Sequence, residues 1–224
     1  NLSDSDDSVH MQHALSTQDL KVDIGHAGTA MRFLTSYFAA DEGRETVLTG
    51  SERMQNRPIK ILVNALQNLG ANISYEAKVG YPPIRIIGTK ITKKKVQING
   101  NVSSQYISSL LLIASQLEKG LEIELIGKIT SVPYIKMTLS LLNQLGIETN
   151  FEGNSIKVYP KKAVEKQNVV VESDWSSASY FYSIVALAEI GTEIQLSAYK
   201  KESLQGDSCL AEIYQHFGVE TTFG

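Results

Sequence analysis

The chain has little of what marks three broad classes of protein. Its 224 residues include one cysteine, Cys209, so an internal disulfide is excluded, and a reducing compartment such as the cytoplasm is expected. No apolar run approaches the roughly 20 residues that span a bilayer, and no membrane partner is expected. A net charge of −3 gives no electrostatic basis for binding nucleic acid.

The common catalytic signatures are also missing. The sequence contains no P-loop, no dinucleotide-binding glycine motif and no Ser-His-Asp arrangement. The spacing of its four histidines does not match that of metal ligands (His10, His13, His26 and His216). Asp6, Asp7 and Asp174 are interpreted as helix-capping residues rather than general bases.

What the sequence does contain is a repeat. Residues 25–32, 102–106 and 174–180 each place glycine or small hydroxyl residues where a helix is predicted to begin. Thr29, Ser104 and Ser177 are separated by 75 and 73 residues, a period typical of one repeated supersecondary unit. Free N–H groups and the helix dipole favour negative charge at such helix starts. The repeat therefore suggests a shared anionic ligand.

Hydrophobic periodicity and breakers predict the order βαβαββ within each repeat. In the second repeat the predicted elements are strand 95–99, helix 104–117, strand 121–126, helix 133–145, and a hairpin of 147–151 and 156–159. In the first they are helix 29–40, strand 45–49, helix 58–69, and strands 71–75 and 84–87. In the third they are strand 169–172, helix 177–190, strand 192–196 and helix 207–217. Such repeats predict an α/β (α+β) fold. Sheets packed around buried helices are consistent with the repeats but are not dictated by them.

The predicted helix at 4–15 resembles only the second helix of a repeat, and the third repeat stops before its last strand. We therefore expect the chain to be a piece of a longer protein.

Three residues near the first predicted helix could bind an anion. Gly28 lets a ligand approach the backbone, although a capped helix with a tight turn explains it as well. Arg57, just before Pro58 at a predicted helix start, suggests recognition of a carboxylate or phosphate; the alternative is a surface pair with Glu52. Arg32 could bind an anion or bridge to a buried carboxylate.

The second repeat supplies hydroxyl and amide groups at matching places. Ser103, Ser104 and Gln105 offer two hydroxyls, an amide and helix-end N–H groups, which suit a phosphate beside another polar group. Ser131 precedes the second predicted helix of this repeat and could add a further hydroxyl. Each serine could instead be an ordinary N-cap.

These segments, in this order, resemble the 5-enolpyruvylshikimate-3-phosphate (EPSP) synthase family. The matching motifs are 2–7, 27–32, 52–54, 57–59, 81–83, 102–106, 133–135 and 176–181. The resemblance implies an inside-out α/β prism of the enolpyruvyl transferase type, in a protein of two three-unit domains. Residues 1–171 would then be most of one domain, and residues 172–224 the truncated start of the other.

The resemblance also implies a function, namely transfer of the enolpyruvyl group of phosphoenolpyruvate to the 5-hydroxyl of shikimate 3-phosphate with release of phosphate. By the same resemblance, one set of residues binds phosphoenolpyruvate (Gly28, Arg57 and Gln105) and another holds shikimate 3-phosphate (Ser103, Ser104 and Ser131). The general base would lie in the missing C-terminal half, so the chain alone is expected to be inactive. The full-length protein is expected to be a monomer without cofactor or metal, and a target of glyphosate.

Two alternatives stay open at this point. A transferase acting on UDP-N-acetylglucosamine shares the architecture, but it uses a cysteine-bearing loop, whereas Cys209 falls in a predicted helix. A non-catalytic anion-binding domain is the second alternative. One departure also stands out: His26 occupies a position where the family usually has asparagine.

Overall fold

The computed structural model describes residues 2–224 and divides the chain into two compact units. The first extends to Val164 and the second is Glu165–Gly224, whereas the sequence placed a domain boundary between 171 and 172. Residues 165–171, which separate these two positions, have no regular secondary structure. The units are described separately below.

The first unit contains two four-stranded sheets with the same strand order. In one sheet the order is β1 (Lys21–Asp23), β2 (Glu45–Thr49), β4 (Ile84–Ile87) and β3 (Asn72–Tyr75). In the other it is β5 (Lys95–Asn99), β6 (Leu121–Ile126), β8 (Ser155–Val158) and β7 (Thr149–Glu152). In each sheet the first two strands are parallel and the remaining pairs are antiparallel. The predicted βαβαββ repeat is confirmed for both.

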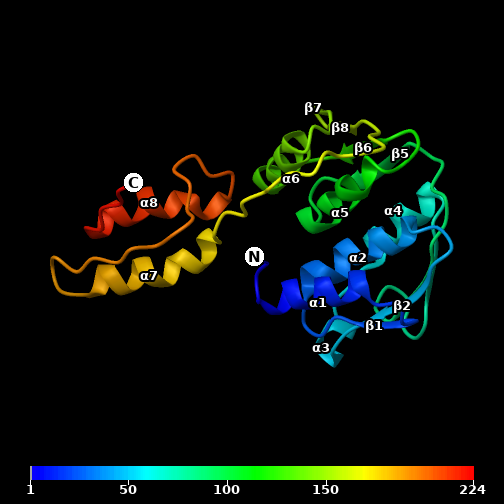
Figure 1. Cartoon of the computed structure of the whole chain (residues 1–224), viewed down its shortest axis with the longest axis horizontal. Helices are drawn as coiled ribbons and strands as arrows, with labels where there is room; N and C mark the ends of the chain where they lie inside the picture. The colour runs from blue at the N-terminus through cyan, green and yellow to red at the C-terminus, as the bar shows by residue number, and fades with distance from the viewer. Residues whose placement is uncertain (1) are drawn as a thin grey trace. The chain divides into compact units, whose positions relative to one another are not determined.

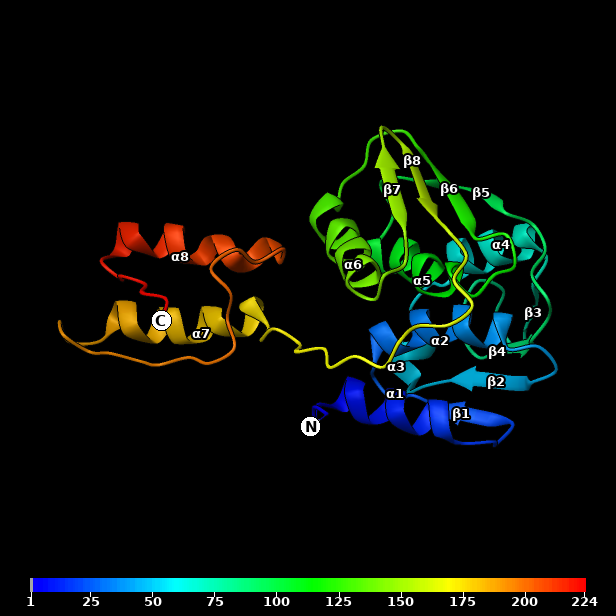
Figure 2. The same cartoon turned by 45° about the horizontal axis from the view of Figure 1, so that its top comes forward.

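Six helices complete the first unit: α1 (Asp6–Ser16), α2 (Gly28–Ala40), α3 (Glu52–Gln55), α4 (Lys60–Leu69), α5 (Ser104–Ala114) and α6 (Val132–Gln144). Figures 1 and 2 show α2 and α5 between the two sheets. Gln105 contacts Thr29 near the start of both helices, and Ser109 contacts Ser36 further along both. The two helices therefore run parallel, and their N-termini lie at the same end.

One hydrophobic core holds the first unit together, since both sheets and the helices contribute to a single cluster of buried side chains. In α4 an apolar stripe is buried, with the 3–4 spacing of an amphipathic helix (Leu62, Val63, Leu66 and Leu69). The strands alternate between the core and the outside: in β6, Leu121, Ile123 and Leu125 are buried. Burial of the helices inside the sheets confirms the predicted α/β class.

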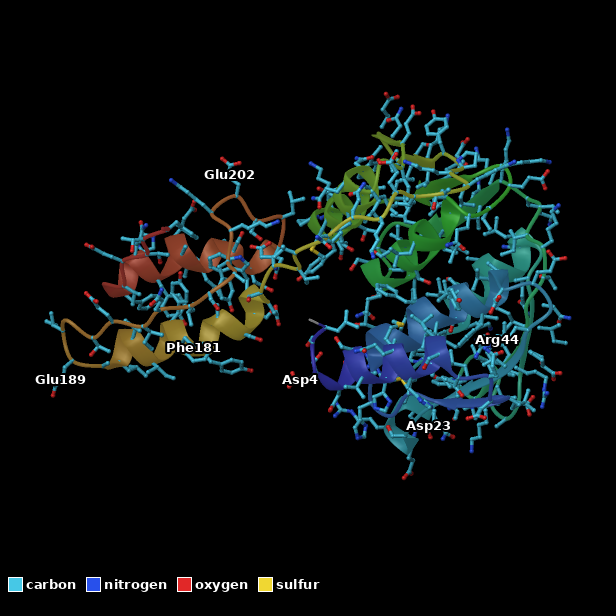
Figure 3. The ribbon with its side chains drawn as sticks, in the orientation of Figure 1. Asp4, Asp23, Arg44, Phe181, Glu189 and Glu202 are labelled. Carbon is cyan, nitrogen blue, oxygen red and sulfur yellow. The ribbon has the colours of Figure 1, made fainter. Side chains whose placement is uncertain are left out.

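The second unit consists of α7 (Trp175–Leu187) and a second helical segment. This segment is a 3₁₀ helix (Gly206–Cys209), a short α-helix α8 (Leu210–Ile213) and another 3₁₀ helix (Tyr214–Phe217), rather than the single helix predicted over 207–217. The small core contains Trp175, Ala178, Tyr182 and Val219. Other apolar side chains of α7 face outward, among them Phe181, which Figure 3 labels.

The strands predicted at 169–172 and 192–196 are wrong, because both segments are irregular. The residues just beyond the two segments are joined, since the Ser173 N–H donates to the Ala198 carbonyl at 2.9 Å. In the first unit, the corresponding parallel pairs are completed by an antiparallel hairpin. Residues 2–224 supply no such hairpin to the third repeat, and two strands alone make a marginal sheet.

Across residues 2–224, no helix is both long and apolar enough to cross a membrane. The same residues contain no group of three or more His, Cys, Asp or Glu side chains placed to hold a metal ion.

Candidate anion-binding site

The candidate residues all lie in loops that follow parallel strands or in the first turns of the helices after those loops. Gly28 follows β1, Arg57 follows β2, Ser103 to Gln105 follow β5, and Ser131 follows β6. Because α2 and α5 run parallel, the carboxyl ends of β1 and β5 lie at the same end of the first unit. The carboxyl ends of parallel strands are where α/β folds commonly bind ligands.

Hydrogen bonds join the loop after β1 to the loop after β2. The Gly25 N–H donates to Oδ1 of Asp23 at 2.8 Å, which closes the turn at the end of β1; Figure 3 labels Asp23. The Ser51 N–H then donates to the Gly25 carbonyl at 3.0 Å. A side chain at Gly50 would lie 2.7 Å from that carbonyl oxygen, so the two loops meet at a position that only glycine fits.

His26 strengthens the same junction. Its Nδ1 lies 2.9 Å from the Ser51 hydroxyl, and Ser51 in turn caps α3 by accepting the Met54 N–H at 3.3 Å. The histidine thus connects the loop before Gly28 to the short helix before Arg57.

Gly28 and Arg57 lie against each other. A Cβ atom at Gly28 would fall on Nη1 of Arg57 and 3.1 Å from its Cζ. The guanidinium therefore lies directly over the first residue of α2. Arg57 is exposed. Among residues 2–224 no ion pair involves Arg57 or Glu52. The surface pair with Glu52 that the sequence allowed is not formed.

Gln105 brings the second repeat to the same place. Its Nε2 donates to the Thr29 hydroxyl at 3.1 Å, which joins the first turns of α5 and α2. The next residue, Tyr106, is buried and donates its hydroxyl to the Pro58 carbonyl at 2.8 Å. Three segments distant in sequence, at Gly28, Arg57 and Gln105, therefore converge.

Arg32 lies beneath this convergence. It is 5% exposed, and its Nη1 donates to the Gly28 carbonyl at 2.8 Å. Burial lowers the pKa of Arg32, the neighbouring charge of Arg57 lowers it further, and Tyr106 raises it. Within the described part of the chain no carboxylate pairs with it, so the bridge to a buried carboxylate that the sequence allowed is not present.

The three candidate serines lie at the starts of α5 and α6. Ser103 is the N-cap of α5 and Ser131 that of α6, and neither side chain makes a capping hydrogen bond. The Thr130 N–H donates to the Gly100 carbonyl at 3.2 Å, so the loops that carry Ser131 and Ser103 are joined. Within residues 2–224 the hydroxyls of Ser103, Ser104 and Ser131 form no hydrogen bond, so they are available to a ligand.

The third repeat differs at the corresponding helix start. Oδ1 of Asp174 accepts the Ser176 N–H at 2.9 Å, and Oδ2 accepts the Ser177 hydroxyl at 3.1 Å. A carboxylate of the chain itself thus satisfies the N-terminus of α7 and makes it unsuited to an external anion. The prediction that Asp174 caps the helix is confirmed.

Three residues that hold the site together were not predicted from the sequence to do so: Thr29, Tyr106 and His26. Tyr106 directly follows Gln105, but a buried tyrosine on a helix is more often a core residue, so its position alone gave no signal. The Thr29 and His26 contacts join residues 76 and 25 positions apart, and local patterns do not reveal such partners.

Solved structures define the class of protein with this fold. Two structures of EPSP synthase from Acinetobacter baumannii superpose with a TM-score of 0.63 and 26% identity, covering 75% of this chain and 37% of that one. Two βαβαββ sheets around buried helices, with hydroxyl-rich helix starts at one end, therefore define an enolpyruvyl transferase fold.

The sequence identifies the family within this class. The family model of EPSP synthase (3-phosphoshikimate 1-carboxyvinyltransferase) matches residues 3–224, and the chain belongs to this family. Curated relatives named 3-phosphoshikimate 1-carboxyvinyltransferase include one from Bacteroides fragilis strain YCH46, 45% identical over 223 residues, and one from Mannheimia haemolytica, 36% identical over 258 residues. Both matches cover 100% of this chain, but only 54% and 58% of the relatives. The chain thus spans about half the length of the curated relatives it matches.

Proposed function

We propose that this chain is the part of an EPSP synthase that binds phosphoenolpyruvate and shikimate 3-phosphate. The convergence of Gly28, Arg57 and Gln105 carries the proposal, because it places a guanidinium, helix-end N–H groups and an amide around one point. A phosphate is the ligand that such a group of donors suits. Two observations support the choice of two phosphorylated substrates. The chain belongs to the family, and the serine side chains at the N-caps of α5 and α6 make no capping hydrogen bond.

We propose a separate set of binding residues for each substrate. Gly28, Arg57 and Gln105 bind phosphoenolpyruvate, while Ser103, Ser104 and Ser131 hold shikimate 3-phosphate. In the proposed reaction the 5-hydroxyl loses its proton as its oxygen bonds to C2 of phosphoenolpyruvate, and C3 gains a proton. The tetrahedral ketal then loses phosphate and a C3 proton, which restores the C2–C3 double bond and gives the enol ether. We assign none of these proton transfers to residues 2–224, and we expect the chain alone to be inactive. The reaction needs no metal or organic cofactor.

A reducing compartment belongs to the same proposal. Cys209 is a free, exposed thiol, which suits the cytoplasm. We further propose that the complete enzyme is a monomer and a target of glyphosate. Sedimentation velocity of the full-length gene product tests the first point, and inhibition of its phosphate release tests the second.

Calorimetric titration of the chain with shikimate 3-phosphate tests the proposed function. Ser104→Ala should weaken binding by about fivefold to tenfold, since it removes a hydrogen bond to a charged group. The matched control is Ser177→Ala, the equivalent residue of the third repeat, whose hydroxyl is held by Asp174; its affinity should equal that of the wild type. Absence of shikimate 3-phosphate binding to the wild-type chain would reject the proposal.

The whole enzyme requires a separate measurement. The full-length gene product should release phosphate when both substrates are present, and the 224-residue chain should not. Tight binding of both substrates without phosphate release by the full-length product would instead establish a non-catalytic anion-binding protein.

A further inference from the structure

Arg32 is a buried cation without a counter-charge. It is 5% exposed, and among residues 2–224 no carboxylate lies within ion-pair distance. Burying an unpaired charge is costly, and an apolar side chain of similar size would pack there at lower cost. Packing alone therefore does not account for an arginine at this position.

The contacts of Arg32 connect the three segments that carry Gly28, Arg57 and Gln105. Its Nη1 donates to the carbonyl of Gly28 and lies 3.9 Å from Sδ of Met54, the residue of α3 three positions before Arg57. Its own carbonyl accepts the Ser109 hydroxyl of α5 at 2.8 Å. Tyr106, which interacts with the guanidinium, also holds the Pro58 carbonyl.

Charge gives Arg32 a second effect. The like charge of Arg57 disfavours the charged state of Arg32, so the two guanidinium groups repel each other while the site is empty. An anion bound over Gly28 would lie near both cations and relieve this repulsion. The pair is therefore better suited to a dianion than to a neutral ligand.

We propose that Arg32 is a positioning residue of the anion site: its buried guanidinium fixes the first turn of α2 against α3 and α5, and its charge adds to the attraction for a phosphate at Gly28. This inference rests on the proposed function and deepens it. Arg32 does not need to touch the ligand, because it acts through Gly28 and Arg57.

Phosphate titration followed by NMR tests the inference on the 224-residue chain, with inorganic phosphate as the probe. In the wild type, the amide signals of residues 28–30 and the side-chain Nε signal of Arg57 should shift with added phosphate. Arg32→Met keeps the apolar stem and removes the charge, and should weaken this binding about tenfold or more. Arg32→Lys keeps the charge but not the forked geometry, and should give a smaller loss of about threefold to fivefold.

The control separates positioning from general stability. Arg44, labelled in Figure 3, is another mostly buried arginine of the same unit; it donates to the Thr17 carbonyl at 2.8 Å and lies over the Phe38 ring. Arg44→Met should lower the urea midpoint of the first unit but leave the phosphate affinity unchanged.

Three outcomes would overturn the inference. The first is wild-type affinity in Arg32→Met, or in Arg32→Lys if the methionine variant does not fold. The second is a loss in Arg44→Met as large as that in Arg32→Met. The third is a wild-type chain whose residues 28–30 do not respond to phosphate. These outcomes can be told apart from a failure of the proposed function, because that function is tested by a separate titration with shikimate 3-phosphate.

Discussion

At the scale of single residues, two glycines of the first unit show how the same substitution can affect different properties. A Cβ atom at Gly28 meets the end of the Arg57 side chain, whereas one at Gly88 meets the backbone of Asp41 and the Phe38 carbonyl. A guanidinium can move away by rotating its side chain, but the end of α2 cannot move without disturbing the core. We therefore expect Gly28 to control ligand affinity and Gly88 to control stability.

Gly28→Ala should weaken the binding of phosphoenolpyruvate, measured by calorimetry with shikimate 3-phosphate present, by about tenfold or more, because the new methyl group displaces the Arg57 guanidinium. The urea midpoint should change little, since alanine favours the first turn of α2 more than glycine does. The control is Gly206→Ala, where a Cβ would meet nothing within 4 Å. Equal affinity of both variants would contradict the assigned role of Gly28.

Gly88→Ala should lower the free energy of unfolding of the first unit by about 3 kcal/mol or more, because overpacking here displaces backbone rather than a side-chain end. A Cβ at this position would lie 2.6 Å from the Asp41 carbonyl carbon and 2.9 Å from the Phe38 oxygen. Urea unfolding followed by circular dichroism measures the loss. A change below about 1 kcal/mol would show that the end of α2 adjusts freely.

At the scale of elements, Glu172 organises the start of the second unit although it lies in no helix or strand. Its carboxylate accepts the Trp175 indole N–H at 2.9 Å, the Lys200 N–H at 3.0 Å and the Ser203 hydroxyl at 3.0 Å. Burial opposes ionisation of Glu172, but these hydrogen bonds outweigh it, and the pKa of the carboxyl is lowered. The carboxylate therefore connects the beginning of α7 to the irregular segment at 198–205.

A lowered carboxyl pKa makes the stability of the second unit depend on pH. The folded state binds this proton less readily than the unfolded state, so the stabilisation is complete above the ordinary glutamate pKa of about 4.3 and is lost as the pH falls through the lower, folded pKa. The urea midpoint reported by Trp175 fluorescence should fall between pH 6 and pH 3. Glu172→Gln should lower the midpoint at pH 6 and reduce this pH dependence. Glu189→Gln, at an exposed position labelled in Figure 3, should leave the pH dependence unchanged.

The elements that could be predicted from sequence are those with a strong periodic pattern. The strand predicted at 45–49 is confirmed exactly, and the helix at 29–40 differs by one residue, because apolar spacing and flanking glycines define both. The strand β1 and the helix α3, three and four residues long, are too short to show a period. The segment at 192–196 has an alternating pattern, but a strand needs a partner, and local sequence does not show whether one exists.

The grouping of the candidate residues was predictable only in part. The residue types and their order pointed to Gly28, Arg57 and Gln105, and the structure brings these three together. How they are held could not be predicted, because contacts such as those of Arg32 with Gly28 and of Tyr106 with Pro58 depend on the packing of α2 against α5. Ser103 also illustrates this limit, since the sequence is the same whether the serine caps its helix or faces a ligand.

At the scale of the whole molecule, the two units have separate cores of unequal size. The first buries side chains from both sheets and the helices, whereas the fully buried apolar residues of the second are Trp175, Ala178, Tyr182 and Val219. Hydrophobic stabilisation grows with the apolar area removed from water. The second unit should therefore be the less stable of the two.

The only tryptophan of the chain makes this difference measurable. Trp175 is 2% exposed and belongs to the second unit, so its fluorescence should report unfolding at a lower urea concentration than far-ultraviolet circular dichroism, to which the first unit contributes most helices and all strands described in residues 2–224. Coincident transitions would show instead that the chain unfolds as one cooperative body.

Because both sheets have the same strand order, the loops of the candidate site and the turns before β2 and β6 lie at opposite ends of the first unit. These turns contain exposed residues such as Gly43 and Lys119. The substitution Lys119→Cys, in a variant that also carries Cys209→Ser, would allow oriented immobilisation on a sensor surface with the candidate anion-binding loops facing the solution.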